Sequence, residues 1–209
     1  MNMLAVSTSA KHPSAALYLE QSGENDLNCR GVIFFKRDES NKPHSVSLGA
    51  LVDGVLEEAG LVVSDIDEFA VDIGPGSFTG VRIGVSFVNA LAYSNKKPVY
   101  AVPSLAALRN LAPDEKTVCV MLDARNGNGY AAVYDKLGCI LEPCACIQSE
   151  IIERFAADAV CIGDAFDKDC ECDAALVIME ALRSREHSVK TAVPLYLRPS
   201  QAERMREKS

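Results

Sequence analysis

The order of expected strands and helices occurs twice along the 209-residue chain, and this repeat restricts the possible folds more than any other feature. Each half gives three strands, a helix, a strand and a second helix, from β-branched and aromatic runs and from apolar residues at helical spacing. The first half has strands at 3–9, 15–20, 31–37 and 69–73 and helices at 44–60 and 81–94. The second has strands at 117–123, 130–135, 139–147 and 160–162 and helices at 149–157 and 174–185. Such a duplication predicts an α/β protein of two similar lobes.

Three prolines mark the join between the two halves: Pro98, Pro103 and Pro113. We therefore expect the boundary within residues 96–116, with an N-terminal lobe at 1–100 and a reduced C-terminal lobe at 101–209. Residues 21–30 are polar and contain a glycine, so we expect them to form an extended hairpin tip.

Composition excludes several classes of protein. With 48% hydrophobic and 24% charged residues, the chain is not a disordered polymer. Its longest apolar run, Ala174–Met179, is far shorter than the roughly 20 residues of a membrane span. Residues 1–6 lack the basic and apolar regions of a secretion signal, so we expect a cytoplasmic protein without a membrane partner.

The chain is acidic overall, and its charged residues are unevenly distributed along the sequence. The net charge is −8, and a pI near 4.9 argues against a broad basic face that grips nucleic acid. Residues 183–209 nevertheless hold seven Lys or Arg and three Asp or Glu. This basic tail would reach either RNA or an acidic partner, and charge alone does not choose between them.

The eight cysteines do not predict a metal site. The two close pairs, Cys144-x-Cys146 and Cys170-x-Cys172, lack the C-x₂-C spacing of zinc ribbons. Imidazole could come only from three scattered residues: His12, His44 and His187. We therefore expect reduced thiols that pack as small hydrophobic residues.

A glycine-rich segment joins an expected strand to an expected helix. Its loop residues are Gly74, Pro75, Gly76, Ser77, Phe78, Thr79 and Gly80. No Gly-Lys-Ser/Thr follows, and the third glycine of a dinucleotide fingerprint would fall on Thr79. The loop could cradle an anion at the helix N-terminus, but glycines in such a place more often serve tight turns and close packing.

The helix after this loop carries a polar stripe that lacks charge after its first residue. Uncharged polar and aromatic residues suit a protein interface better than a face left in water, and the 44–60 helix offers small residues for close approach. The candidate interface residues are His44, Ser47, Ala50, Gly54, Arg82, Ser86, Asn89 and Tyr93. The alternative is a tight helix pair within the chain, and for His44 a capping or solvated side chain.

The chain resembles the TsaB (YeaZ) family over essentially its whole length. The resemblance rests on four motifs: Gly74-Pro-Gly-Ser-Phe-Thr-Gly-Val-Arg-Ile-Gly84, Val102-Pro-Ser-Leu105, Leu122-Asp-Ala-Arg125 and Pro194-Leu-Tyr-Leu-Arg-Pro199. It implies the duplicated fold of actin, sugar kinases and heat-shock chaperone ATPase domains, called ASKHA. It also implies a role in forming threonylcarbamoyladenosine in tRNA.

In that family the protein is a non-catalytic subunit that binds and activates a catalytic paralogue, TsaD. The resemblance therefore implies no catalytic residue, no metal and no cofactor in this chain. The implied partners are a TsaD-like paralogue and a TsaE-like ATPase, with tRNA reached only through the complex. When alone, the protein is expected to be a homodimer, formed through the same helices and loop.

The residues agree with a lost active site. The H-x-x-x-H stretch of the catalytic paralogue matches Ser104-Leu-Ala-Ala-Leu108, which has no ligand at either end. In the first hairpin, Ser7 stands at the position that usually holds an acidic residue in this fold. Asp123 of the second hairpin has no nearby acidic partner. A metallopeptidase is rejected because the histidines form no H-E-x-x-H. The remaining alternative is a nucleotide-dependent phosphotransferase or ATPase with weak residual activity.

Overall fold

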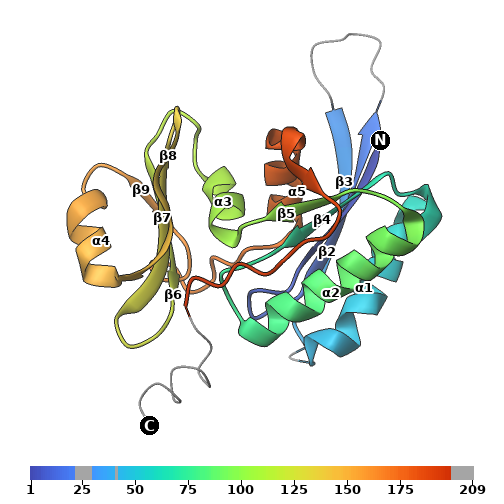
Figure 1. The fold of residues 1–209 in the computed structure, drawn as a ribbon, viewed down its shortest axis with the longest axis horizontal. Coiled ribbons are helices and arrows are strands. Elements are labelled where there is room, and N and C mark those ends of the chain that lie inside the picture. Colours follow the sequence, from blue (N-terminus) through green and yellow to red (C-terminus); the bar gives the residue numbers. More distant parts are fainter. Residues whose placement is uncertain (22–29, 41, 199–209) are drawn as a thin grey trace.

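A computed structural model describes residues 1–21, 30–40 and 42–198 as two sheets covered by helices (Figure 1). The first half contains β1 (Asn2–Ser7), β2 (Ser14–Gln21), β3 (Arg30–Arg37), α1 (His44–Ala59), β4 (Glu68–Asp72), α2 (Phe78–Asn95), β5 (Val99–Val102) and α3 (Ser104–Leu108). The second half contains β6 (Val118–Asp123), β7 (Asn128–Asp135), β8 (Gly138–Ile147), α4 (Gln148–Phe155), β9 (Val160–Ile162), α5 (Ala174–Arg183) and β10 (Ser188–Val189). Three 3-10 turns complete the list: Val63–Asp65, Arg109–Leu111 and Arg185–His187.

The expected repeat is present in both sheets as the same strand order. β1 pairs antiparallel with β2 and parallel with β4, and β2 pairs antiparallel with β3. β6 pairs antiparallel with β7 and parallel with β9, and β7 pairs antiparallel with β8. The first sheet continues past β4 with β5 and β10. The prediction of a duplicated α/β unit is confirmed.

The first sheet is buried on both faces, because helices cover each of them. Along β1, Leu4 and Val6 belong to an apolar cluster with the inner faces of α1 and α2. Met3 and Ala5 point the other way and join a cluster with α3 and α5. Figure 1 shows α1 and α2 together on one face of this sheet and α5 on the other. The outward sides of α1 and α2 are thereby left as surface.

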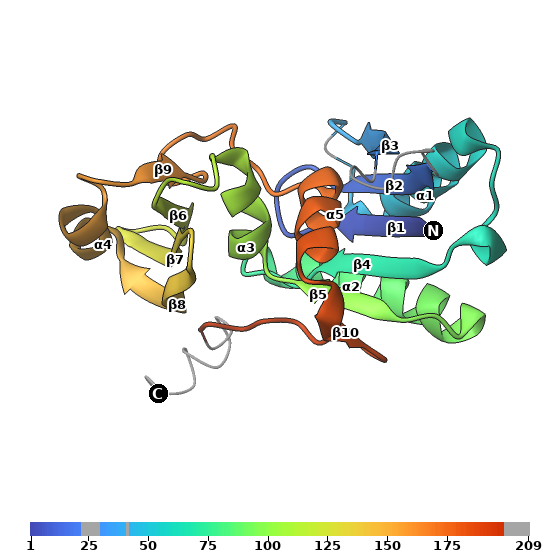
Figure 2. The ribbon, with the colours of Figure 1, turned by 90° about the horizontal axis from the view of Figure 1, so that it is seen from above.

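The C-terminal part of the chain returns to the first sheet. α5 follows the second sheet in sequence but packs against β1, β2 and β4. β10 then pairs antiparallel with β5 at the sheet edge, as Figure 2 shows. The division into lobes at 1–100 and 101–209 stays a prediction, and α5 and β10 are the elements that link the two halves.

Some local predictions differ from the structure. α2 begins at Phe78 rather than Val81, because Ser77 is its N-cap and accepts a hydrogen bond from the Gly80 N–H. The sequence did not predict β5, a four-residue strand with prolines close by on both sides, nor the two-residue β10. Such short elements carry too little periodicity to be recognised.

Two predicted segments lie partly beyond what the structure describes. The β2–β3 hairpin is confirmed by pairing up to Gln21 and Arg30, but its tip at 22–29 lies outside the described residues. The end of the basic tail, at 199–209, also lies outside them. Within the described part of the chain, every helix is too short or too polar to span a membrane.

The packing of α5 on the first sheet predicts the effect of truncating its buried side chains. Ile178 is fully buried, so Ile178→Ala should lower the free energy of unfolding by about 2–4 kcal/mol in urea denaturation. The neighbouring Met179 is 43% exposed, and Met179→Ala should change it by less than about 1 kcal/mol. Equal losses in the two variants would contradict the observed orientation of α5.

Candidate functional site

A buried carboxylate lies where the two central strands of the first sheet end. Asp72, the last residue of β4, is fully buried. It accepts hydrogen bonds from the hydroxyls of Ser7 (2.8 Å), Ser9 and Ser104 and from the Gly74 N–H (2.9 Å). These donors come from β1, the turn after it, the start of α3 and the glycine-rich loop. Hydrogen bonds to this one side chain therefore connect four segments of the chain.

The positions expected to have lost metal ligands take part in packing. Ser7 and Ser104 donate to Asp72, and Leu108 is fully buried in the apolar core. The sequence analysis did not single out Asp72. The available signal was an acid at the end of a fully apolar strand, where a carboxylate needs several donors to be buried.

The glycine-rich loop packs tightly against the turn after β1. A Cβ atom on Gly76 would overlap the Ser9 backbone, and one on Gly80 would overlap the Thr8 carbonyl. The Ser77 N–H donates to the Ser9 carbonyl (2.7 Å), and the Thr8 hydroxyl donates to the Gly80 carbonyl (2.7 Å). The glycines thus allow close backbone approach, and the amides of Ser77 and Gly80 are already used.

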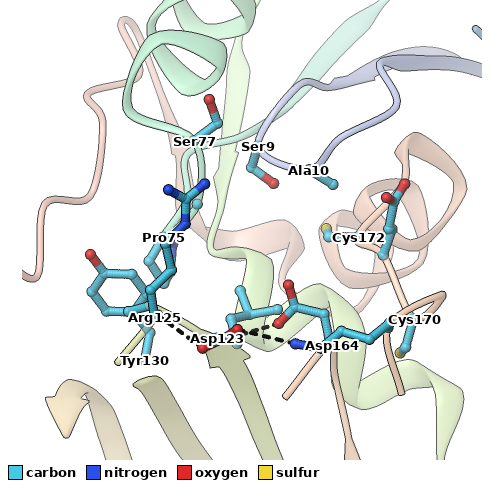
Figure 3. A pocket seen from close by; sticks show the side chains of 15 residues that line it. Ser9, Ala10, Pro75, Ser77, Asp123, Arg125, Tyr130, Asp164, Cys170 and Cys172 are labelled. Carbon is cyan, nitrogen blue, oxygen red and sulfur yellow. Dashed lines mark hydrogen bonds and ion pairs between the residues drawn. The ribbon is translucent and has the colours of Figure 1, made fainter. Parts of the chain in front are cut away.

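A pocket of about 340 Å³ separates this loop from the turn between β6 and β7 (Figure 3). Four of its five charged side chains, all but that of Arg125, already have a polar partner within the described part of the chain. Asp123 accepts from Lys168 Nζ (3.1 Å), its own N–H donates to Asp164, and His12 lies 2.9 Å from Glu171. The pKa of Asp123 is lowered, chiefly by the Arg125 amide, whereas burial raises the pKa of Asp164. The described residues contain no group of three or more His, Cys, Asp or Glu side chains that could hold a metal.

The cysteines within the described ranges are free thiols. Cys119 and Cys172 are buried as expected of small hydrophobic residues, whereas Cys139 is exposed and the other four are half-buried. Burial raises the pKa of Cys119 to about 11 and that of Cys172 well above its ordinary value. Both buried groups are therefore neutral thiols at physiological pH. Cys29 lies outside the described residues.

The structure separates the candidate interface residues of α2 into two groups. Ser86 is exposed, and Tyr93 is 87% exposed. Asn89 is half-buried and forms two 2.9 Å hydrogen bonds with the backbone of Ala192. The exposed Arg82 lies over the Phe78 ring and donates to the Tyr196 hydroxyl (2.6 Å). The chain's own C-terminal segment therefore occupies one flank of the stripe.

The candidates on α1 are also divided. Ala50 is exposed, but Ser47 is buried and bonds to the Pro43 carbonyl. His44 is half-buried, and its Nε2 bonds to the Lys11 carbonyl (3.0 Å), in keeping with a structural role. Gly54 faces the aliphatic stem of Lys36. Of these four residues, Ala50 is the one whose side chain is exposed.

Further residues of the two helices lie at or near the surface beside the predicted interface residues. We define the outer face by its members on α1 and α2, which are Val46, Gly49, Ala50, Thr79, Ile83, Ser86, Ala90 and Tyr93. The α2 members follow helical spacing and carry no charge. They lie next to the predicted stripe and share Ser86 and Tyr93 with it.

Comparisons with known proteins identify the family. The model of the family "TsaD: tRNA N6-adenosine threonylcarbamoyltransferase" matches residues 38–168. The tRNA threonylcarbamoyladenosine biosynthesis protein TsaB of Bacillus subtilis is 32% identical over 68% of this chain and 58% of its own length. The chain belongs to the TsaB (YeaZ) family. The TsaB protein of Buchnera aphidicola is 28% identical over 63% of this chain and 60% of its own length.

A solved structure extends this likeness to nearly the whole chain. YeaZ from Pseudomonas aeruginosa superimposes with a TM-score of 0.72 and 26% identity, covering 94% of this chain and 99% of that one. The expected ASKHA-type α/β fold is thereby confirmed. The chain spans 52–60% of the length of the four curated TsaB proteins that it matches.

The carboxylate of Asp72 is predicted to stabilise the site strongly. Asp72→Ala removes the acceptor of three buried hydroxyls and should lower the free energy of unfolding by about 3 kcal/mol or more, measured by denaturant titration. Asp53 is exposed on α1, so Asp53→Ala should change it by no more than about 0.5 kcal/mol. If both variants unfold at the same denaturant concentration, the serine network does not stabilise the fold.

Proposed function

We propose that the chain is a non-catalytic subunit in the formation of threonylcarbamoyladenosine in tRNA, and that it binds and activates a TsaD-type catalytic paralogue. The observation that carries this proposal is the outer face, where α2 presents uncharged residues and Tyr93 stands 87% exposed. The names of the relatives, which refer to threonylcarbamoyladenosine biosynthesis, support the pathway.

Gly49 gives a second argument for a partner on this face. It lies inside α1, where glycine is less favourable than alanine by roughly 1 kcal/mol. A Cβ atom at this position would meet nothing within 4 Å, so packing within the chain does not require a glycine. A partner helix that packs closely beside Val46 and Ala50 would require a glycine at position 49.

The site supports a subunit without its own catalysis. The places where a catalytic paralogue would carry metal ligands hold Ser104 and Leu108, which are both buried and engaged in packing. We propose that the same outer face forms the homodimer when the chain is alone, so that self-association and TsaD binding compete. In this proposal a TsaE-like ATPase completes a cytoplasmic complex, and tRNA is reached through that complex.

Charge placed on the outer face should prevent association. Ser86→Arg and Ala50→Arg each add a bulky cation at an exposed position of the outer face. In light scattering, the TsaD-type partner should change the species formed by the native chain but not that formed by either variant. The matched control is Leu137→Arg, at an 86% exposed position between β7 and β8, which should associate normally. Association of all three variants would refute the assignment of this face.

Gly49 separates folding from association. Gly49→Ala should raise the free energy of unfolding of the isolated chain by roughly 0.5–1 kcal/mol, because it removes the entropic cost of a helical glycine. Gly49→Phe should fold as well, since the site is open, but it should lose partner binding in the same light-scattering assay. Normal binding by Gly49→Phe would contradict close approach at this turn.

The role in tRNA modification has its own test. Deletion of the gene should remove threonylcarbamoyladenosine from tRNA, as seen by nucleoside mass spectrometry, and the native chain should restore it. The alternative of a residual nucleotide-dependent enzyme is decided by isothermal titration with ATP and Mg²⁺. Tight binding to the isolated chain would favour that alternative.

A further inference from the structure

A second hollow of about 440 Å³ lies at the C-terminal end of α2, beside β10. Three of its eight lining residues are lysines, Lys96, Lys97 and Lys190, and none is acidic. This is a local concentration of positive charge in a chain whose net charge is −8. The lysines come from segments far apart in sequence, which the pairing of β10 with β5 brings together.

The lysines are not needed to cap the helix. The last carbonyls of α2 accept backbone hydrogen bonds, from the Lys97 N–H to Ala92 (3.0 Å) and from the Lys96 N–H to Tyr93 (3.3 Å). Lys96 has a left-handed backbone (φ 55°), where glycine would be less strained. A lysine at a position that favours glycine is consistent with a use for its side chain.

Two of the three ammonium groups are available to a ligand. Lys97 lies 3.6 Å from Asp67, in a pair that is partly exposed. Lys96 and Lys190 are exposed, and neither lies within 4.0 Å of a carboxylate among the residues that the structure describes. Tyr93 borders the same hollow with its ring 87% exposed. In proteins that bind single-stranded nucleic acid, cationic side chains contact the phosphates, and a neighbouring exposed aromatic ring stacks on a base.

We propose that this hollow binds the backbone of RNA, with Lys96 and Lys190 on phosphates and Tyr93 against a base. The proposal rests on the proposed function, because tRNA is then the RNA that meets this surface. It gives the chain one small RNA contact in place of a broad basic face, in agreement with its acidic composition. Tyr93 also ends the outer face, so RNA held here would lie at the edge of the bound partner.

The test uses the full chain in complex with its TsaD-type partner and a fluorescently labelled, unmodified tRNA transcript. Affinity is measured by fluorescence anisotropy at several salt concentrations for the native chain and for Lys96→Gln/Lys190→Gln. Each lost phosphate contact should reduce the slope of log K against log salt by about 0.7–0.9. The double variant should therefore bind roughly 25- to 60-fold more weakly at 0.1 M salt, with a slope smaller in magnitude by about 1.4–1.8. The control, Lys136→Gln, alters an exposed lysine between β7 and β8 and should match the native chain.

Three results would overturn the inference. One is a double variant whose salt slope equals that of Lys136→Gln, and another is the absence of tRNA binding by the native complex at low salt. The third is a double variant that keeps its RNA affinity but loses the protein partner, which would assign the hollow to an acidic protein segment. If the native chain restores tRNA modification in the deletion strain while any of these holds, this inference fails and the proposed function stands.

Discussion

The buried carboxylate of Asp72 is the interaction on which the arrangement around the first sheet depends. An isolated carboxylate in an apolar core is strongly unfavourable, and here three hydroxyls and an amide donate hydrogen bonds to it. These hydrogen bonds hold the ends of β1 and β4, the start of α3 and the glycine-rich loop next to one another. The loop in turn positions α2, whose inner side completes the core and whose outer side is the proposed interface.

The two proposed surfaces follow from this arrangement. Because α1 and α2 cover one face of the first sheet and α5 covers the other, the outward sides of α1 and α2 form part of the molecular surface. The C-terminal segment then crosses α2, bonding to Asn89 and Arg82, and leaves Ser86, Ala90 and Tyr93 open. The lysine hollow lies at the end of the same helix, so partner binding and RNA contact would be neighbouring events on one scaffold.

Sequence reasoning located most of the elements because each long element carries its own periodicity. The repeat of strand and helix order was visible, and the glycine motif pointed to the family and to close packing. The sequence did not predict the short strands β5 and β10, and it could not show the contacts that a side chain makes with residues distant in the chain. Asn89 belongs to the predicted stripe, and its side chain donates a hydrogen bond to the carbonyl of Ala192, 103 residues away in the sequence.

The sequence by itself determined the duplicated α/β pattern, the acidic balance and the family motifs, because these are properties of local runs and of composition. Only the tertiary structure decided which donors surround Asp72, which flank of α2 stays open and that Lys190 joins Lys96. Each of these depends on contacts between residues far apart in the chain, such as Ser7 and Asp72, which are separated by 65 positions. Local spacing cannot encode such contacts, because they form only when the sheets and the returning C-terminal segment pack.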